Sequence, residues 1–226
     1  MARILVYNND ANRMETYYRG EQEAMPYVTG RTLTVKEFRG SSNSNLLWTE
    51  KRAMLAWNSQ RYIYGKPIKV GYAFRRPWEG GHSTLSQHYA GLAFDVGQTL
   101  TTTERNNLYN SAVNSGVWTY VEPQILTPTW IHFDKRRGNP ACSTGGYPQI
   151  QMGSRGAYVM IAQDDLNTLG YKTGGLDGIF GSNTQTAVRN YQQNKGLAVD
   201  GIIGCNTWRS LQEDVLGKGK TSTTID

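Results

Sequence analysis

The chain contains three histidines, His82, His88 and His132, and each lies in or beside a segment with strand character. His88 and Asp95 are seven positions apart, and Gly91 between them can turn the backbone. Imidazole and carboxylate groups are the side chains that hold catalytic metal ions. These residues are therefore the candidates for a metal site.

The predicted strands would aim Asp95 and His132 away from the protein core. Side chains alternate between the two faces of a strand, so the apolar neighbours of Asp95 point to the opposite face. In the second strand, Ile131 and Phe133 fall on one face and His132 and Asp134 on the other. One face of each strand can then be core while the other carries polar groups.

Two imidazoles and one carboxylate leave a fourth tetrahedral position for water, which is how proteins hold catalytic zinc. Bound zinc lowers the pKa of that water toward about 7 and polarises a substrate carbonyl. The spacing of His88 and Asp95 does not establish ligation by itself, since a histidine in a strand is more often packed or solvated. The surrounding residues carry more information.

The segment Ser86-Gln-His-Tyr-Ala-Gly-Leu-Ala-Phe-Asp95 resembles the Ser-x-His-x-x-Gly-x-Ala-x-Asp signature of the zinc D-Ala-D-Ala carboxypeptidase and endolysin peptidase family, which is grouped with lysostaphin and Hedgehog domains. The segment Trp130-Ile-His132 resembles the strand of the third ligand. The resemblance covers about residues 32–137. It implies a Zn²⁺ ion bound by His88, Asp95 and His132.

The same resemblance suggests roles for two further residues. The family places an arginine after an aromatic residue near the substrate, and Arg75 follows Phe74 in this way. We expect Arg75, rather than its neighbour Arg76, to stabilise negative charge on the scissile carbonyl oxygen. Hedgehog domains have a histidine six positions before the first ligand, as His82 is here. A role beside the zinc or the substrate and a solvated turn histidine are both open for it.

The general base departs from the common family pattern, in which a glutamate stands three residues before the third ligand. Thr129 occupies that position here, so nearby carboxylates are the candidates. Glu122 follows Tyr120 upstream of the third ligand, an arrangement that resembles Hedgehog domains. We predict Glu122 as the catalytic base. Asp134 is the rival, although a carboxylate two residues beyond a ligand is well placed to orient that ligand.

The C-terminal part contains an internal repeat at an offset of 23 residues, in which Leu176 to Thr184 recurs as Val199 to Thr207. Each copy has an Asp-Gly turn, followed by an Asn-Thr pair that we expect at a helix N-cap. Residues 151–213 resemble the three-helix peptidoglycan-binding module, whose signature is Asp-Gly-Ile-Phe-Gly followed by Thr, an Ala-Val pair and a Gln-containing helix. This resemblance implies binding to bacterial peptidoglycan.

Helical periodicity predicts helices over residues 45–64, 103–116, 156–170 and 183–195. Strands are predicted over 68–74, 92–96 and 130–133, and a short strand or entry segment over 33–38. The predicted fold is an α+β catalytic domain, with a small antiparallel sheet carrying the zinc site, followed by an all-α three-helix peptidoglycan-binding domain. The predicted boundaries are 1–31 for a segment of unknown role, 32–137 for the peptidase, 138–150 for a linker, 151–213 for the binding domain and 214–226 for a tail.

Composition narrows the class of protein. The net charge of +6 over 226 residues favours a polyanionic partner, but no basic stripe points to nucleic acid, and no apolar run is long enough for a membrane span. The apolar run after Arg3 is too short for a secretory signal. Cys142 and Cys205 are too few for a disulfide framework, and we expect free thiols.

These observations predict a monomeric zinc peptidase of the endolysin type, anchored to the wall, which hydrolyses an amide bond of the stem peptide or cross-bridge. It would be made in the cytoplasm and reach the wall on release or lysis. A catalytically silent wall-binding protein with a structural zinc site is the alternative, as is a nucleic-acid-binding protein suggested by charge alone. The sequence leaves open which bond is cut.

Overall fold

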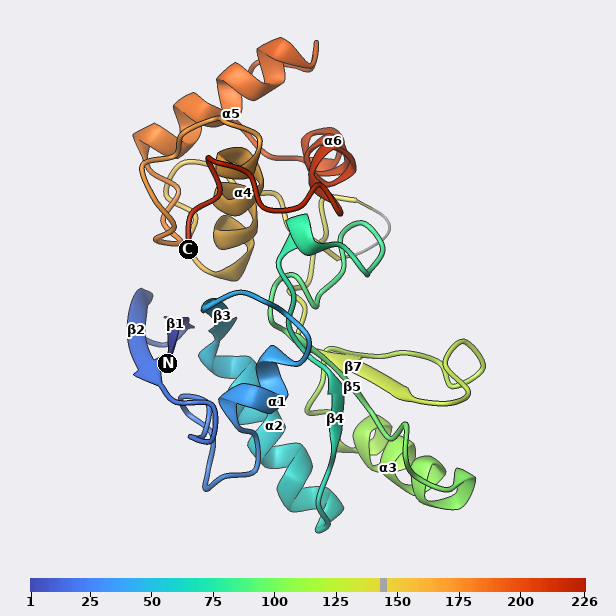
Figure 1. Cartoon of the computed structure of the whole chain (residues 1–226). Helices are drawn as coiled ribbons and strands as arrows, with labels where there is room; N and C mark the ends of the chain where they lie inside the picture. Colours follow the sequence, from blue (N-terminus) through green and yellow to red (C-terminus); the bar gives the residue numbers. More distant parts are fainter. Residues whose placement is uncertain (143–145) are drawn as a thin grey trace.

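The computed structural model describes residues 1–142 and 146–226 and contains helices together with two small sheets (Figure 1). The first sheet has the strand order β2-β1-β3, with β1 antiparallel to β2 and parallel to β3. Its strands are β1 (Ala2–Asn8), β2 (Arg13–Arg19) and β3 (Leu46–Glu50). The segment whose role the sequence left unknown therefore supplies two of these strands.

The second sheet is antiparallel, with the order β4-β5-β7-β6. Its strands are β4 (Val70–Tyr72), β5 (Ala93–Val96), β6 (Tyr120–Val121) and β7 (Ile131–Asp134). The helices α2 (Lys51–Tyr64) and α3 (Thr102–Ser115) contact each other, and α3 also contacts β7. Phe94 and Phe133 pair across β5 and β7 and are fully buried, so one face of this sheet is core.

Two predicted elements before the site are wrong. The predicted helix over 45–64 divides into β3 and then α2, because the apolar run at the start of this segment pairs with β1 and is buried on both faces. The predicted strand over 33–38 is instead the short helix α1 (Val35–Arg39). Thr34 and Glu37 form a capping box at its start, a signal that the sequence contains.

Near the C-terminus lie α4 (Ala157–Thr168), α5 (Ser182–Asn194) and α6 (Cys205–Val215), gathered at one end of the molecule (Figure 1). A buried glutamine explains the repeat. The Gln163 amide donates to the Asp177 carboxylate at 2.8 Å and accepts from the Gly178 N–H at 2.9 Å. Gln192 makes the equivalent bonds to Asp200 and Gly201, both at 2.9 Å.

The expected N-cap role of the Asn-Thr pairs is wrong. Gly181 and Gly204 occupy the N-cap positions, and each pair lies inside the first helical turn. Thr184 instead accepts a hydrogen bond from the side-chain amide of Gln163. The Asp-Gly motif is thus held by buried polar contacts within the module.

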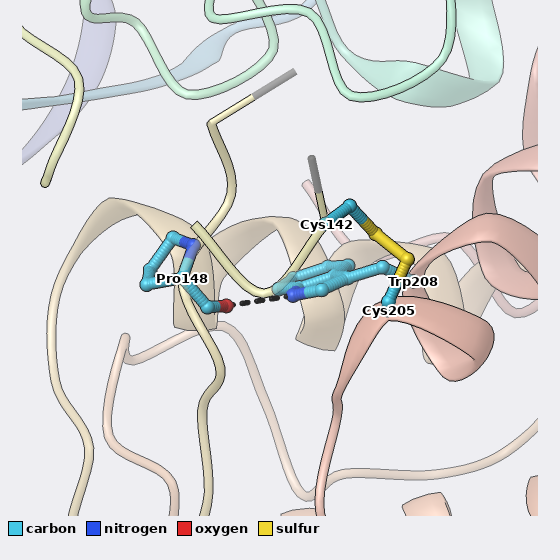
Figure 2. Close-up of a disulfide and its surroundings, with 4 residues drawn as sticks. All are labelled: Cys142, Pro148, Cys205 and Trp208. Atoms are coloured by element: carbon cyan, nitrogen blue, oxygen red, sulfur yellow. Dashed lines mark hydrogen bonds between the residues drawn. A yellow bond between two sulfur atoms is a disulfide. The ribbon is translucent and has the colours of Figure 1, made fainter. Parts of the chain in front are cut away.

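The expectation of free thiols is also wrong, because a disulfide joins Cys142 to Cys205 at the start of α6 (Figure 2). The two cysteines are 63 positions apart, so no local pattern in the sequence indicated that they pair. Next to this bond, the Trp208 indole N–H donates to the carbonyl oxygen of Pro148 at 2.8 Å. Ile150 exchanges backbone hydrogen bonds with Ile203, so the segment predicted as a linker is fastened to the C-terminal helices.

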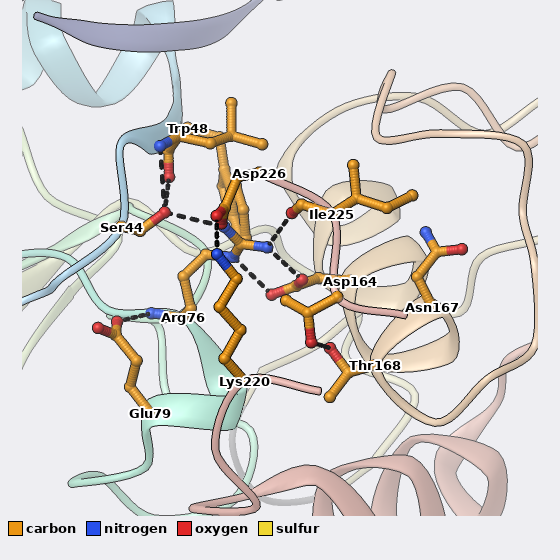
Figure 3. Close-up of polar contacts among 12 residues, drawn as sticks. Ser44, Trp48, Arg76, Glu79, Asp164, Asn167, Thr168, Lys220, Ile225 and Asp226 are labelled. Atoms are coloured by element: carbon orange, nitrogen blue, oxygen red, sulfur yellow. Dashed lines mark hydrogen bonds and ion pairs between the residues drawn. The ribbon is translucent and has the colours of Figure 1, made fainter. Parts of the chain in front are cut away.

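The buried Arg76 connects the part of the chain before residue 138 to α4 and to the C-terminal residues (Figure 3). Arg76 is fully buried and makes two bonds to the Asp164 carboxylate of α4, at 2.5 and 2.8 Å. Its guanidinium also donates to Ser44 at 2.8 Å and to the carbonyl oxygen of Ile225 at 2.7 Å. The predicted tail thus packs against both parts.

Within the described residues, none of the helices combines the length and apolar character that a bilayer crossing needs.

Candidate metal centre

The register of two neighbouring strands brings Asp95 and His132 together, since they are directly opposed in the β5 and β7 pair. His88 comes from the turn just before β5. One ligand atom from each of the three side chains lies within 4.8 Å of the others. The side-chain directions predicted from strand alternation are therefore those of the structure.

The turn that carries His88 depends on a glycine. The Gly91 N–H donates to the His88 carbonyl oxygen at 3.1 Å, and Gly91 has a φ of 65°. A Cβ atom at this position would lie 2.1 Å from the Trp48 carbonyl oxygen. Only glycine satisfies both the left-handed backbone and this close approach.

Hydrogen bonds orient both imidazole rings. Nδ1 of His88 lies 3.0 Å from the Ala73 carbonyl oxygen, which leaves Nε2 facing Asp95 at 3.3 Å. Nδ1 of His132 lies 2.8 Å from the other Asp95 oxygen, and its Nε2 lies 3.1 Å from Asp134. Each ring therefore turns one nitrogen toward Asp95 and is held through the other, the usual arrangement of metal-binding histidines.

Asp134 is fully buried and is held in turn by Arg136, whose guanidinium donates to both of its oxygens at 2.5 to 3.0 Å. Burial raises the pKa of this carboxyl, but the bonds to Arg136 and His132 outweigh it and lower the pKa. A carboxylate held ionised in this way is suited to orienting His132 rather than to exchanging protons with a substrate.

The electrostatics of the cluster favour a cation. Burial lowers the pKa of His132, but its hydrogen bonds to Asp134 and Asp95 outweigh this effect and raise the pKa to about 9. Burial raises the pKa of Asp95, but its hydrogen bonds to His132 and His88 outweigh burial, so the pKa of this carboxyl is lowered. Two imidazoles and one carboxylate that converge beside a second carboxylate, Asp134, form a set of donors that fits a Zn²⁺ ion.

His82 lies directly against the cluster. Its ring stacks on His88 with a centroid distance of 4.3 Å and an interplanar angle of 17°, and the Tyr72 ring meets its edge at 4.3 Å. Burial and the neighbouring charge of His88 lower the pKa of His82 to about 3, so the ring is neutral. Within residues 1–142 and 146–226, Nε2 of His82 is buried without a hydrogen-bond partner.

The two adjacent arginines have different places. Arg75 donates to the Tyr72 hydroxyl at 2.6 Å, beside the stacked histidines. Arg76 is the buried group that binds Asp164 and is therefore committed to structure. Arg75 does not line the pocket over the cluster, which contains other arginines.

A pocket of about 530 Å³ lies over the cluster, a size that suits a small ligand or a peptide segment. It is lined by residues 82–88, Asp95, Tyr120, Glu122, Trp130, His132, Arg136 and Arg209. Glu122 enters the pocket because its backbone N–H donates to the His132 carbonyl oxygen at 2.9 Å, which places the two residues side by side.

Sequence reasoning missed Arg136, Arg209 and Tyr120. Arg136 stands two positions after Asp134, so alternation along the strand could have placed the two side chains together. Its guanidinium also lies 3.9 Å from the centre of the Tyr120 ring. Arg209 comes from α6, and no local pattern connects it to the histidines.

Comparison with known proteins identifies the C-terminal part. Residues 155–211 match the family described as "Putative peptidoglycan binding domain". The spore cortex-lytic enzyme of Bacillus cereus is 44% identical over 62 residues, 27% of this chain and 24% of that protein. The N-acetylmuramoyl-L-alanine amidase CwlM of Mycobacterium tuberculosis is 45% identical over 65 residues, 29% of this chain and 16% of that protein.

Among solved structures, the crystal structure of the SleB N-terminal domain is 40% identical and covers 30% of this chain and 92% of that chain, with a TM-score of 0.29. The chain spans about a quarter or less of the length of the two curated relatives. The family model shows that the chain contains a peptidoglycan-binding module, which lies within residues 155–211.

Proposed function

We propose that this chain is a zinc-dependent peptidoglycan peptidase that is held on the wall by its C-terminal module. The observation that carries the proposal is the convergence of His88, Asp95 and His132 in a pocket that is also lined by Glu122. The curated relatives are named spore cortex-lytic enzyme and N-acetylmuramoyl-L-alanine amidase, and their likeness to the C-terminal module supports the cell wall as the target. The resemblance of residues 32–137 to zinc peptidases favours an amide of the stem peptide or cross-bridge as the substrate.

Zinc held by the three side chains would supply an activated water and polarise the carbonyl of the scissile amide. Asp134 keeps the His132 ring oriented through the contact at Nε2. Glu122 takes the proton that the attacking water loses and returns it to the leaving amine. Its backbone bond to His132 keeps the carboxylate at the same end of the pocket as the ligands.

His82 lines the pocket beside His88, and Arg75 lies near it, outside the residues that line the pocket. The neutral His82 ring packs on His88 and restricts its rotation, while Arg75 adds positive charge next to Tyr72. We propose that this charge stabilises the oxyanion that develops on the scissile carbonyl. The binding module raises the local concentration of substrate, because hydrolysis then occurs on a wall to which the enzyme is already tethered.

The test is a digest of purified sacculi with the zinc-loaded protein, analysed by mass spectrometry. We expect new amino termini within stem peptides or cross-bridges, and their absence in a digest with the Glu122→Gln variant. That variant should retain zinc and lose roughly two or more orders of magnitude in turnover. Release of intact stem peptides from muramic acid would identify an amidase instead. An undigested wall would favour the catalytically silent alternative.

A further inference from the structure

The binding module contributes a side chain to the pocket over the metal cluster. Arg209 lies on α6, within the segment that matches the peptidoglycan-binding family, and it lines the same pocket as His88 and His132. The side chain is exposed and forms no hydrogen bond or ion pair with another of the residues that the structure describes. The other arginine of this pocket, Arg136, is already bound to the Asp134 carboxylate.

Several contacts fix α6 relative to the pocket wall. Cys205, one helical turn before Arg209, is bonded to Cys142 (Figure 2). Trp208 packs against the Tyr147 ring with centroids 5.1 Å apart, and the Tyr147 hydroxyl donates to the Ser86 carbonyl oxygen at 2.7 Å. Since Ser86 lines the pocket, a continuous series of contacts joins Arg209 to the loop that carries His88.

We propose that Arg209 is a substrate-binding residue whose guanidinium binds a carboxylate of the stem peptide while the scissile amide lies at the His88, Asp95 and His132 cluster. This inference rests on the proposed function and extends it. The module then has two roles, since it tethers the enzyme to the wall and also completes the pocket in which the peptide is held.

A carboxylate is the ligand chemistry that fits. Guanidinium presents a planar fork of donors that matches a carboxylate with two parallel hydrogen bonds. A stem peptide offers such groups at the α-carboxyl of its D-glutamate and at its C-terminus. Arg209 lines the pocket, and none of the described residues takes up its donors, so the guanidinium is available to a ligand.

The experiment uses the peptide L-Ala-γ-D-Glu-L-Lys-D-Ala-D-Ala and two analogues, one amidated at the D-glutamate α-carboxyl and one at the C-terminus. The variants are Arg209→Gln and Arg209→Lys. Lys172→Gln is the matched control, because it removes one positive charge from an exposed position of the same module outside the pocket. Steady-state hydrolysis by the full zinc-loaded chain and calorimetric binding of each peptide to the zinc-free chain are both measured.

For Arg209→Gln we expect KM and Kd to rise about tenfold for peptides that keep the recognised carboxylate, the scale of one hydrogen-bonded charge near the surface. The analogue that lacks this group should bind the wild type and the variant equally, which identifies the carboxylate. Arg209→Lys should lie between them because a lysine keeps the charge without the fork. Lys172→Gln should match the wild type in KM, Kd, kcat and sacculus binding, and Arg209→Gln should raise KM far more than it lowers kcat.

Unchanged Kd values for Arg209→Gln, or an equal loss for all three peptides, would overturn the role of Arg209. The proposed function is judged separately by wild-type hydrolysis. A wild type that cleaves neither peptides nor sacculi would refute the peptidase, while the calorimetric comparison of Arg209→Gln with Lys172→Gln would still decide whether the carboxylate is bound.

Discussion

Replacement of Arg76 by methionine should be among the most damaging single changes in this chain. Arg76 and Asp164 are both fully inaccessible to solvent, and the guanidinium lies 5.1 and 5.3 Å from the ring centres of Trp48 and Trp78. Removal of the arginine leaves the Asp164 carboxylate buried without a cation. Breaking a buried pair in this way costs about 3–5 kcal/mol of unfolding free energy.

Two further variants separate the ion pair from the packing around it. The double variant Arg76→Met/Asp164→Leu removes both charges, and it should recover most of the loss because apolar replacement of a buried pair is often neutral. Asp164→Asn alone should cost less than Arg76→Met, since Arg76 would keep its bonds to Ser44 and to the Ile225 carbonyl oxygen.

The loss should also depend on pH. Burial raises the pKa of Asp164 even beside Arg76, and without the arginine it rises further. A folded-state pKa above the unfolded value of about 3.9 means that stability falls as pH rises through this interval. The difference in unfolding free energy between Arg76→Met and the wild type should therefore be smaller at pH 4 than at pH 7.

Denaturant unfolding of the three variants at both pH values measures the free energy of unfolding. Thermal unfolding should show a melting temperature about 6–20 °C lower for Arg76→Met at pH 7. A loss below about 1 kcal/mol would refute the reasoning, because it would mean that Asp164 is solvated or repaired by other groups. A double variant as unstable as Arg76→Met would place the effect in packing instead of charge.

Three other predictions follow from buried groups. Burial and the neighbouring Asp164 charge raise the pKa of Asp165 well above its usual value, so Asp165→Asn should raise the melting temperature at pH 7. This gain should vanish below about pH 4, because the wild-type carboxyl is then protonated in both the folded and the unfolded state. Parallel melting curves of the two proteins across pH would contradict this. Cys142→Ser/Cys205→Ser should lower the free energy of unfolding by about 4 kcal/mol, because the unfolded chain gains entropy without the disulfide. Denaturant unfolding measures this loss, and a reductant should bring the wild type to the same midpoint. Gly91→Ala should cost about 2–4 kcal/mol through backbone strain and the clash with a carbonyl oxygen, and it should lower zinc content measured at equal folded fraction; a normal melting temperature would show that the turn can relax.

The sequence predicted the parts of the site that depend on local rules. Alternation along β5 and β7 gave the directions of Asp95 and His132, and helical periodicity located α4 and α5 to within one or two residues. These features follow from the backbone geometry of a few consecutive residues. The family resemblance then indicated which of these side chains belong to one metal site.

The parts that were missed depend on contacts between distant segments. β3 was predicted as helix because its apolar run suits either state, and its pairing with β1 decides the outcome. Cys142 and Cys205 are 63 positions apart and meet only in the folded chain, as do Arg209 and residues 82–88, which line one pocket. The sequence favoured Arg75 over Arg76 for catalysis, but it could not show that Arg76 is bound to the distant Asp164.

The central claim is that His88, Asp95 and His132 form a zinc centre. Elemental analysis of the purified full-length protein, with His88→Ala and His132→Ala prepared in parallel, tests it directly. The account predicts about one zinc per chain in the wild type and a small residual amount in each variant, since two remaining donors hold the ion weakly. Full zinc occupancy in both variants, with their folds intact by circular dichroism, would contradict it.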